Sequence, residues 1–211
     1  MKRTLMLSAA ALAALSLAAC NKTAANNAGS TASDTAANAA TSAATATNKA
    51  EDATGAAVGA TSANTLGSHD TGAFVSNASQ GDMYEVQAAQ IAQKRSKNKD
   101  VVAFAKMMVK DHTKSTAMMK PLMAAANQTP AAKLDDRRQG FIDHLNSASD
   151  ADFDKTYIDQ QVAAHQEALD LLQGYAKDGS DAGLKGGAAN LAPTVQMHLD
   201  KAKSIQAGLK S

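Results

Sequence analysis

The sequence predicts an all-α protein, an antiparallel four-helix bundle with a short extra helix, preceded by a signal peptide and a disordered linker. Apolar residues recur at alternating intervals of three and four over long stretches, and no alternating strand pattern persists. Four such stretches are long and joined by short connections, an arrangement typical of antiparallel bundles.

The predicted helices lie in the C-terminal two thirds of the chain. The four bundle helices cover residues 72–96, 100–126, 151–177 and 181–209, and the short helix covers residues 134–146. Asp100 is expected to cap the second helix or to stand in its first turn. Pro121 is expected to kink that helix, because proline removes a backbone hydrogen bond. Pro193 and the Gly186-Gly187 pair are expected to weaken the last helix.

The first 20 residues have the character of a targeting segment. Lys2 and Arg3 precede an uncharged run of Ala and Leu that is too short to span a bilayer. The run ends in Leu17-Ala18-Ala19-Cys20, which resembles the lipobox of bacterial lipoproteins. The resemblance implies that residues 1–19 are a signal peptide and that Cys20 is lipidated. We therefore expect a lipid-anchored protein of the cell envelope, and Asn21 favours the outer membrane, facing the periplasm.

Residues 20–70 have the composition of a flexible tether. Between residues 21 and 70, Ala, Thr, Ser, Asn and Gly fill 41 of the 50 positions. Such a segment has too little apolar surface to offset the entropy lost on ordering. We therefore expect the folded domain to cover residues 71–211.

Composition excludes several classes of function. The net charge of +1 argues against a nucleic-acid-binding protein, and a single Cys excludes a disulfide framework or a cysteine-rich zinc site. With only three Glu, none of them three residues before a His, the chain lacks the ligands of a ferritin-type di-iron centre. Zincin, phosphate-loop and nucleophile-elbow motifs are absent from the sequence. We therefore expect no enzyme.

One group of polar residues falls on the inward stripes of the predicted helices: Glu85, His112, His165 and His198. Imidazoles and a carboxylate in one layer of a bundle would suit zinc or iron. Met108 lies one turn before His112, and a soft thioether there would suit copper. The same residues also fit a buried polar network without metal. His69 and His144 are expected to be exposed or in loops.

The chain also resembles a known family. The fragments Met108-Val109-Lys110-Asp111-His112 and Pro193-Thr194-Val195-Gln196-Met197-His198 resemble the bacterial domain of unknown function 4142, and the resemblance covers residues 72–207. It implies a ferritin-like helical fold in an envelope protein. The leading interpretation is a non-enzymatic envelope lipoprotein whose bundle is an interaction or stress-related module. The alternative is a copper, zinc or iron site made by Glu85, His112 and the other two inward His.

Overall fold

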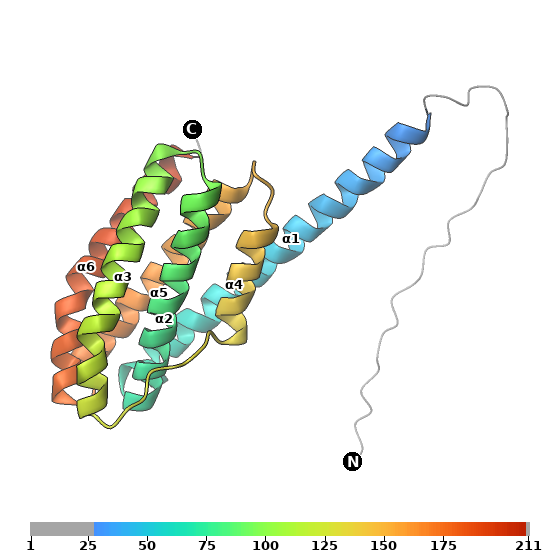
Figure 1. Cartoon of the computed structure of the whole chain (residues 1–211). Coiled ribbons are helices and arrows are strands. Elements are labelled where there is room, and N and C mark those ends of the chain that lie inside the picture. Colours follow the sequence, from blue (N-terminus) through green and yellow to red (C-terminus); the bar gives the residue numbers. More distant parts are fainter. Residues whose placement is uncertain (1–27, 210–211) are drawn as a thin grey trace, which may run out of the picture. The chain divides into compact units, whose positions relative to one another are not determined.

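The computed structural model describes residues 28–209, with side chains from residue 42 onward. These residues are all-α and contain no strand (Figure 1). The helices are α1 (Ala28–Asn64), α2 (Thr71–Arg95), α3 (Lys99–Ala125), α4 (Asp136–Ser147), α5 (Phe153–Asp178) and α6 (Ala182–Gly208), with a 3-10 turn η1 (Leu66–Ser68) after α1. The predicted all-α bundle is confirmed, and each predicted helix ends within two residues of its observed bounds. The predicted signal peptide and Cys20 lie outside the described residues.

The chain divides into two units, residues 1–42 and residues 43–211. In the first unit, the described part is the N-terminal portion of α1. The second unit holds the rest of α1 and all the other helices. The core and the candidate site belong to this second unit.

Four long helices form the bundle in two antiparallel pairs (Figure 1). Helix α2 packs on α3 and α5 packs on α6, each pair joined by a three-residue connection. Contacts of α3 with α6 and of α2 with α5 close the ring. Helix α4 and the turn η1 pack against both α2 and α5, so they cover that side of the bundle.

Side-chain caps explain where most of these helices begin. An Asp or Asn carboxylate or amide oxygen accepts a hydrogen bond from the first-turn backbone N–H groups that have no partner within the helix. The capping residues are Asp70 for α2, Asn98 for α3, Asp135 for α4 and Asp181 for α6. Because Asn98 caps α3, Asp100 stands in the first turn of that helix.

Helix α3 continues through Pro121, which was expected to kink it, and α6 continues through Pro193, which was expected to weaken it. Gly187, in the same helix as Pro193, explains part of this tolerance. A Cβ atom at Gly187 would lie 2.8 Å from both Leu122 Cδ1 and Met119 Sδ of α3. The glycine therefore lets α6 approach α3 closely, and tertiary packing outweighs the low helix propensity of the sequence.

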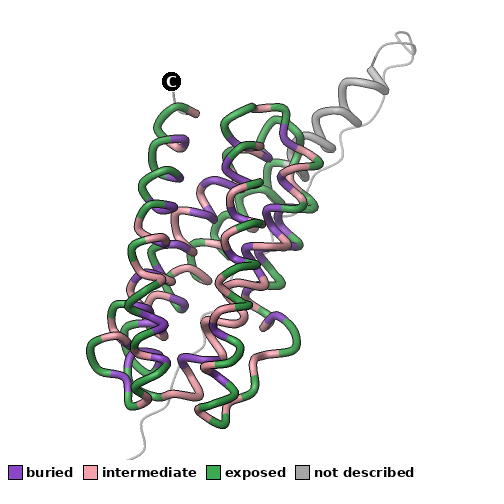
Figure 2. The backbone as a smooth tube through the Cα atoms, turned by 60° about the vertical axis from the view of Figure 1, so that its left-hand side comes forward, coloured by how far each residue is buried: buried purple, intermediate pink, exposed green. Residues whose placement is uncertain are grey.

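The buried apolar residues form two clusters along the bundle. One contains Phe104, Met108 and Tyr157, and the other contains Met119 and Leu172. Figure 2 shows the buried positions recurring along one side of each helix, as the helical period requires. On α3 and α5, polar buried residues stand between the members of the two clusters. The core is therefore interrupted by a polar layer.

The structure differs from the expected tether over residues 43–70. Part of this segment is helical and packs within the second unit, where Ala63, Gly67 and Ser68 are buried. Its small residues let large side chains from other helices lie against the backbone. Gly59 is buried against the Glu167 carboxylate and Arg137, and Arg137 Nη1 donates to Gly55 O at 3.2 Å.

His144 also differs from its expected exposed position. It is buried on α4, and its Nδ1 donates to Asp52 Oδ2 of α1 at 2.6 Å. Gln160 Nε2 of α5 donates to the same carboxylate oxygen at 2.7 Å. Burial raises the pKa of Asp52, although both hydrogen bonds oppose that change. Asp52 is therefore one of the polar contacts that hold the C-terminal part of α1 to α4 and α5. His69 is exposed, as expected.

A bilayer-spanning helix requires about 20 consecutive apolar residues. Among the helices described here, none combines that length with sufficient apolar character.

Gly59→Leu tests the docking of α1. A Cβ atom at position 59 would overlap the Glu167 carboxylate and lie 2.5 Å from Arg137 Nη1. We expect amide hydrogen exchange in residues 43–64 to become about 10-fold faster, while exchange in α2 and α3 is unchanged, because local opening needs few other contacts to break. Hydrogen-exchange mass spectrometry measures the difference.

Gly140→Leu in α4 is the control, since a Cβ atom there would meet nothing within 4 Å. Unchanged exchange of residues 43–64 in Gly59→Leu would contradict the close approach of α1 to Glu167.

Candidate metal centre

Three helices bring a histidine to the same level of the bundle. His112 lies on α3, His165 on α5 and His198 on α6, and all three are buried. Their ring centroids are 5.4–5.5 Å apart. One ring nitrogen from each residue lies within 4.8 Å of the other two. The three histidines predicted to face inward are thus brought together.

Each imidazole has one nitrogen anchored by a hydrogen-bond acceptor outside the trio. His112 Nδ1 donates to Asp82 Oδ1 at 2.8 Å, His165 Nδ1 to Gln161 O at 2.9 Å, and His198 Nε2 to Asp111 Oδ2 at 3.1 Å. A carboxylate or carbonyl oxygen can only accept, so the anchored nitrogen carries the proton. The second nitrogen of a neutral ring then presents a lone pair.

Those second nitrogens have no hydrogen-bond partner among the described residues. They are His112 Nε2, His165 Nε2 and His198 Nδ1, each with almost no solvent-accessible area. Buried polar atoms without partners are costly, and native proteins seldom keep several in one place. Each of these three nitrogens can offer a lone pair in the same buried layer. Together they therefore form a set of ligands suited to a cation.

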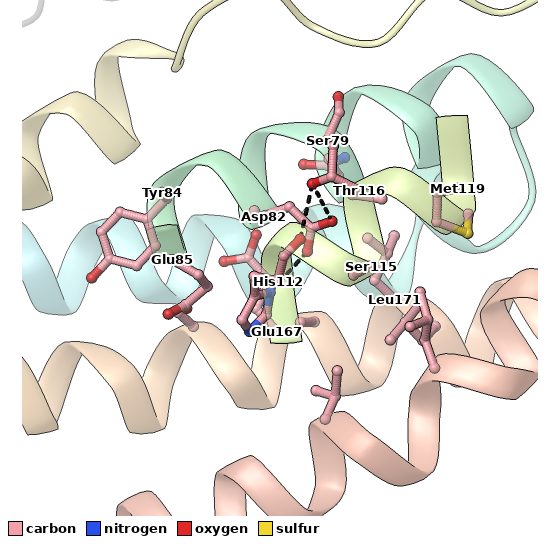
Figure 3. A pocket seen from close by; sticks show the side chains of 18 of the residues that line it. Ser79, Asp82, Tyr84, Glu85, His112, Ser115, Thr116, Met119, Glu167 and Leu171 are labelled. Atoms are coloured by element: carbon pink, nitrogen blue, oxygen red, sulfur yellow. Dashed lines mark hydrogen bonds and ion pairs between the residues drawn. The ribbon is translucent and has the colours of Figure 1, made fainter. Parts of the chain in front are cut away.

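Asp82 is itself held in position. It lies on α2, and its second oxygen accepts a hydrogen bond from Thr116 Oγ1 at 3.0 Å. Figure 3 shows Asp82 between His112 and Thr116, with dashed lines to both. This arrangement orients the His112 ring in the manner of the carboxylates that support metal-bound histidines.

Glu85 lies beside the three histidines but is not one of the converging donors. It is buried on α2, and its Oε1 is 3.7 Å from His165 Nδ1, too far for a hydrogen bond. Burial raises the pKa of Glu85 to about 7, although the nearby His112 charge opposes the shift. Met108, the expected soft ligand, is packed in the apolar cluster with Phe104.

The three imidazoles differ in electrostatic environment. Burial lowers the pKa of His165 well below its usual value, and the charges of His112 and His198 lower it further. Burial and the charge of His112 also lower the pKa of His198. Burial opposes ionisation of His112 too, but the Asp82 hydrogen bond and the neighbouring carboxylates raise its pKa overall. At neutral pH, His165 therefore carries a lone pair rather than a charge.

A cavity of about 280 Å³ adjoins the cluster, and His112, His165 and Glu85 are among the residues lining it. Figure 3 shows further lining residues along α2 and α3, among them Ser79 and Met119. Its walls are mainly apolar. The histidine layer is therefore next to a space that can hold a small molecule.

Sequence reasoning missed the residues that anchor the rings. Asp111 is adjacent to His112 in the sequence, but neighbouring side chains on a helix do not face each other, and Asp111 reaches His198 on α6 instead. Asp82 lies three residues before Glu85, and this spacing, which places two residues on the same side of a helix, was the available signal. Gln161 contributes its backbone carbonyl. Because every residue type has this group, the sequence could not identify it as the acceptor.

The chain was also compared with known proteins. A family model described as "Domain of unknown function (DUF4142)" matches residues 55–205. The chain belongs to this family. The matched range begins inside α1, in agreement with the packing of residues 55–70 in the second unit. No curated protein and no solved structure matches the chain.

Glu85→Gln tests the electrostatics of the layer. Because the folded-state pKa of Glu85 is raised from 4.5 to about 7, its contribution to stability is complete below pH 4.5 and is lost as the pH rises through 7. The free energy of unfolding of the variant, relative to the parent, should therefore increase between about pH 4 and about pH 8, by at most about 3 kcal/mol. Urea denaturation with a chelator present measures it.

The exposed Glu51→Gln serves as the matched control. A pH-independent difference between Glu85→Gln and the parent would contradict the burial of a carboxyl group at this position.

Proposed function

We propose that this chain is a metal-binding protein of the cell envelope, which holds one divalent transition-metal ion in the middle of its bundle. The ligands are His112 Nε2, His165 Nε2 and His198 Nδ1. One observation carries the proposal: these three nitrogens are buried without partners in a layer where one nitrogen of each ring lies within 4.8 Å of the others.

The geometry suits a tetrahedral ion. Nitrogens bound to one zinc ion at its usual bond length lie about 3.3 Å apart. One nitrogen of each ring lies within 4.8 Å of the other two, so small side-chain rotations would bring the nitrogens to that spacing. The proton on the opposite nitrogen of each ring is already held by an acceptor, so the rings are preoriented for coordination.

The donor set favours Zn²⁺ or Cu²⁺ over Mg²⁺ or Ca²⁺, since the last two prefer oxygen ligands. Three protein ligands would leave a fourth position for another ligand, as in zinc sites that bind water or substrate. A bound ion would act there as a Lewis acid. Asp82 and Asp111 would offset part of its charge through the imidazoles that they hold.

A metal-free polar network is the second candidate, and the raised pKa of His112 supports it. A proton on His112 Nε2 would give one of the other rings a hydrogen-bond donor. This interpretation leaves the histidines as structural groups of an interaction module. The two candidates differ in stoichiometric metal binding, which only the first requires.

His165→Ala is the decisive variant for metal binding. We expect the purified chain to bind one Zn²⁺ or Cu²⁺ after dialysis, and His165→Ala to bind it at least about 100-fold more weakly, since one of three ligands is lost. Isothermal titration calorimetry gives the affinity, and elemental analysis gives the stoichiometry.

His69→Ala is the control, because His69 is exposed and lies outside the cluster. Circular dichroism checks that each variant is folded. Absence of stoichiometric metal in the parent chain, or equal affinity in parent and His165→Ala, would exclude the proposed site and favour the polar network.

The envelope location is proposed from the N-terminal sequence alone. Leu17-Ala18-Ala19-Cys20 supports cleavage before Cys20 and lipid attachment to its thiol. We expect the parent chain to fractionate with bacterial membranes and Cys20→Ala to appear in the soluble fraction. Cys20→Ala that stays with the membranes would exclude the lipid as the anchor.

A further inference from the structure

The cavity beside the histidines extends beyond what a metal ion needs. It reaches from His112 and His165 past Met119 and Leu171 to Arg137, where α4 covers the bundle. Its volume of about 280 Å³ is far larger than the space of one or two water molecules. The cavity therefore has room for a small organic molecule next to the proposed ion.

The walls of the cavity indicate that the apolar part of such a molecule would face them. Apolar side chains from several helices make up most of the surface, among them Met123 of α3, Leu172 of α5 and Val195 of α6. Ligand sites of this kind bind apolar groups and fix their orientation through a few polar atoms. The polar end of this cavity is the histidine layer.

The cavity is lined by equal numbers of acidic and basic side chains. Three are acidic and three are basic: Asp82, Glu85, Glu167, Lys120, Arg137 and Arg138. Arg137 and Arg138 are both ion-paired with Glu167, with N–O distances of 2.8 Å. Neither arginine is therefore left to attract an anion, and Lys120 is exposed to solvent. Asp82 and Asp111 would offset the charge of the proposed ion through the imidazoles that they hold. Burial of a further unpaired charge in the cavity would be costly.

We propose that the cavity binds a small uncharged molecule with an apolar body and one nitrogen donor, a ligand type that suits Zn²⁺ and Cu²⁺. The donor atom occupies the fourth position of the proposed metal ion, and the apolar body lies against Met119, Met123 and Leu172. This inference rests on the proposed metal site. It adds the chemical class of the ligand and the direction from which that ligand reaches the ion.

Imidazole and 4-phenylimidazole share the same nitrogen donor, so the difference between their affinities measures the effect of the apolar body. The full chain is loaded with Co²⁺, whose visible absorption reports its coordination, and is titrated with imidazole or with 4-phenylimidazole. We expect both to change the spectrum and 4-phenylimidazole to bind at least about 10-fold more tightly, since its phenyl group removes apolar area from water. Azide, a small anion, is expected to bind more weakly than 4-phenylimidazole.

Gly81→Leu tests whether the cavity provides this preference. Gly81 lines the cavity, and a Cβ atom there meets nothing within 4 Å, so the cavity wall has room for a larger side chain at this position. The change also favours the helix. The preference for 4-phenylimidazole over imidazole should fall at least about 10-fold, with Co²⁺ still bound. Gly140→Leu adds the same side chain at an exposed position outside the cavity and should leave the preference unchanged.

The outcomes separate the two proposals. If neither Co²⁺ nor Zn²⁺ binds, the proposed metal site is excluded and the ligand site with it. If Co²⁺ binds and the two imidazoles have equal affinity, or azide binds more tightly than 4-phenylimidazole, the uncharged apolar ligand is excluded while the metal site stands. If Gly81→Leu keeps the full preference, the ligand does not enter through this cavity.

Discussion

The buried layer of three imidazoles is the constraint on which the arrangement of the bundle depends. Polar rings in an apolar core require partners, and His112, His165 and His198 obtain them from α2, α3 and the α5 backbone. The His198–Asp111 bond joins α6 to α3 and so restricts how the two helix pairs can slide. The His112–Asp82 bond joins α3 to α2 within one pair, and the His165 bond stays within α5. Apolar clusters flank the layer on either side, and the inner nitrogens have no hydrogen-bond partner among the described residues.

The inward position of the three histidines could be predicted because it follows from local geometry. A helical stripe is determined by spacing along one segment, and the stripes of α3, α5 and α6 each contain a histidine. Which oxygen anchors each ring depends instead on the order of helices around the bundle and on their rotation. Asp111 shows the difference: its neighbour in sequence is His112, but its partner is His198.

Glu85 shows the limit of the same reasoning. Its spacing correctly placed it on the inward face of α2, but its carboxylate lies beside the donors rather than among them. The second half of α1 was missed for a different reason. Composition counts the apolar surface that a segment brings, whereas residues such as Gly55 and Gly59 are covered by large side chains of α4 and α5. Part of the apolar surface that is buried at α1 therefore belongs to side chains of α4 and α5, which the composition of α1 does not count.

The ion pairs of Glu167 have a consequence for communication across the fold. Arg137 and Glu167 line the cavity on one side and contact Gly55 and Gly59 of α1 on the other. Thermodynamic linkage then requires that any molecule in the cavity whose affinity depends on the position of Glu167 also changes the free energy of α1 docking, by an equal amount in each direction. Docking of the C-terminal part of α1 and occupancy of the bundle interior are thus thermodynamically coupled through one carboxylate.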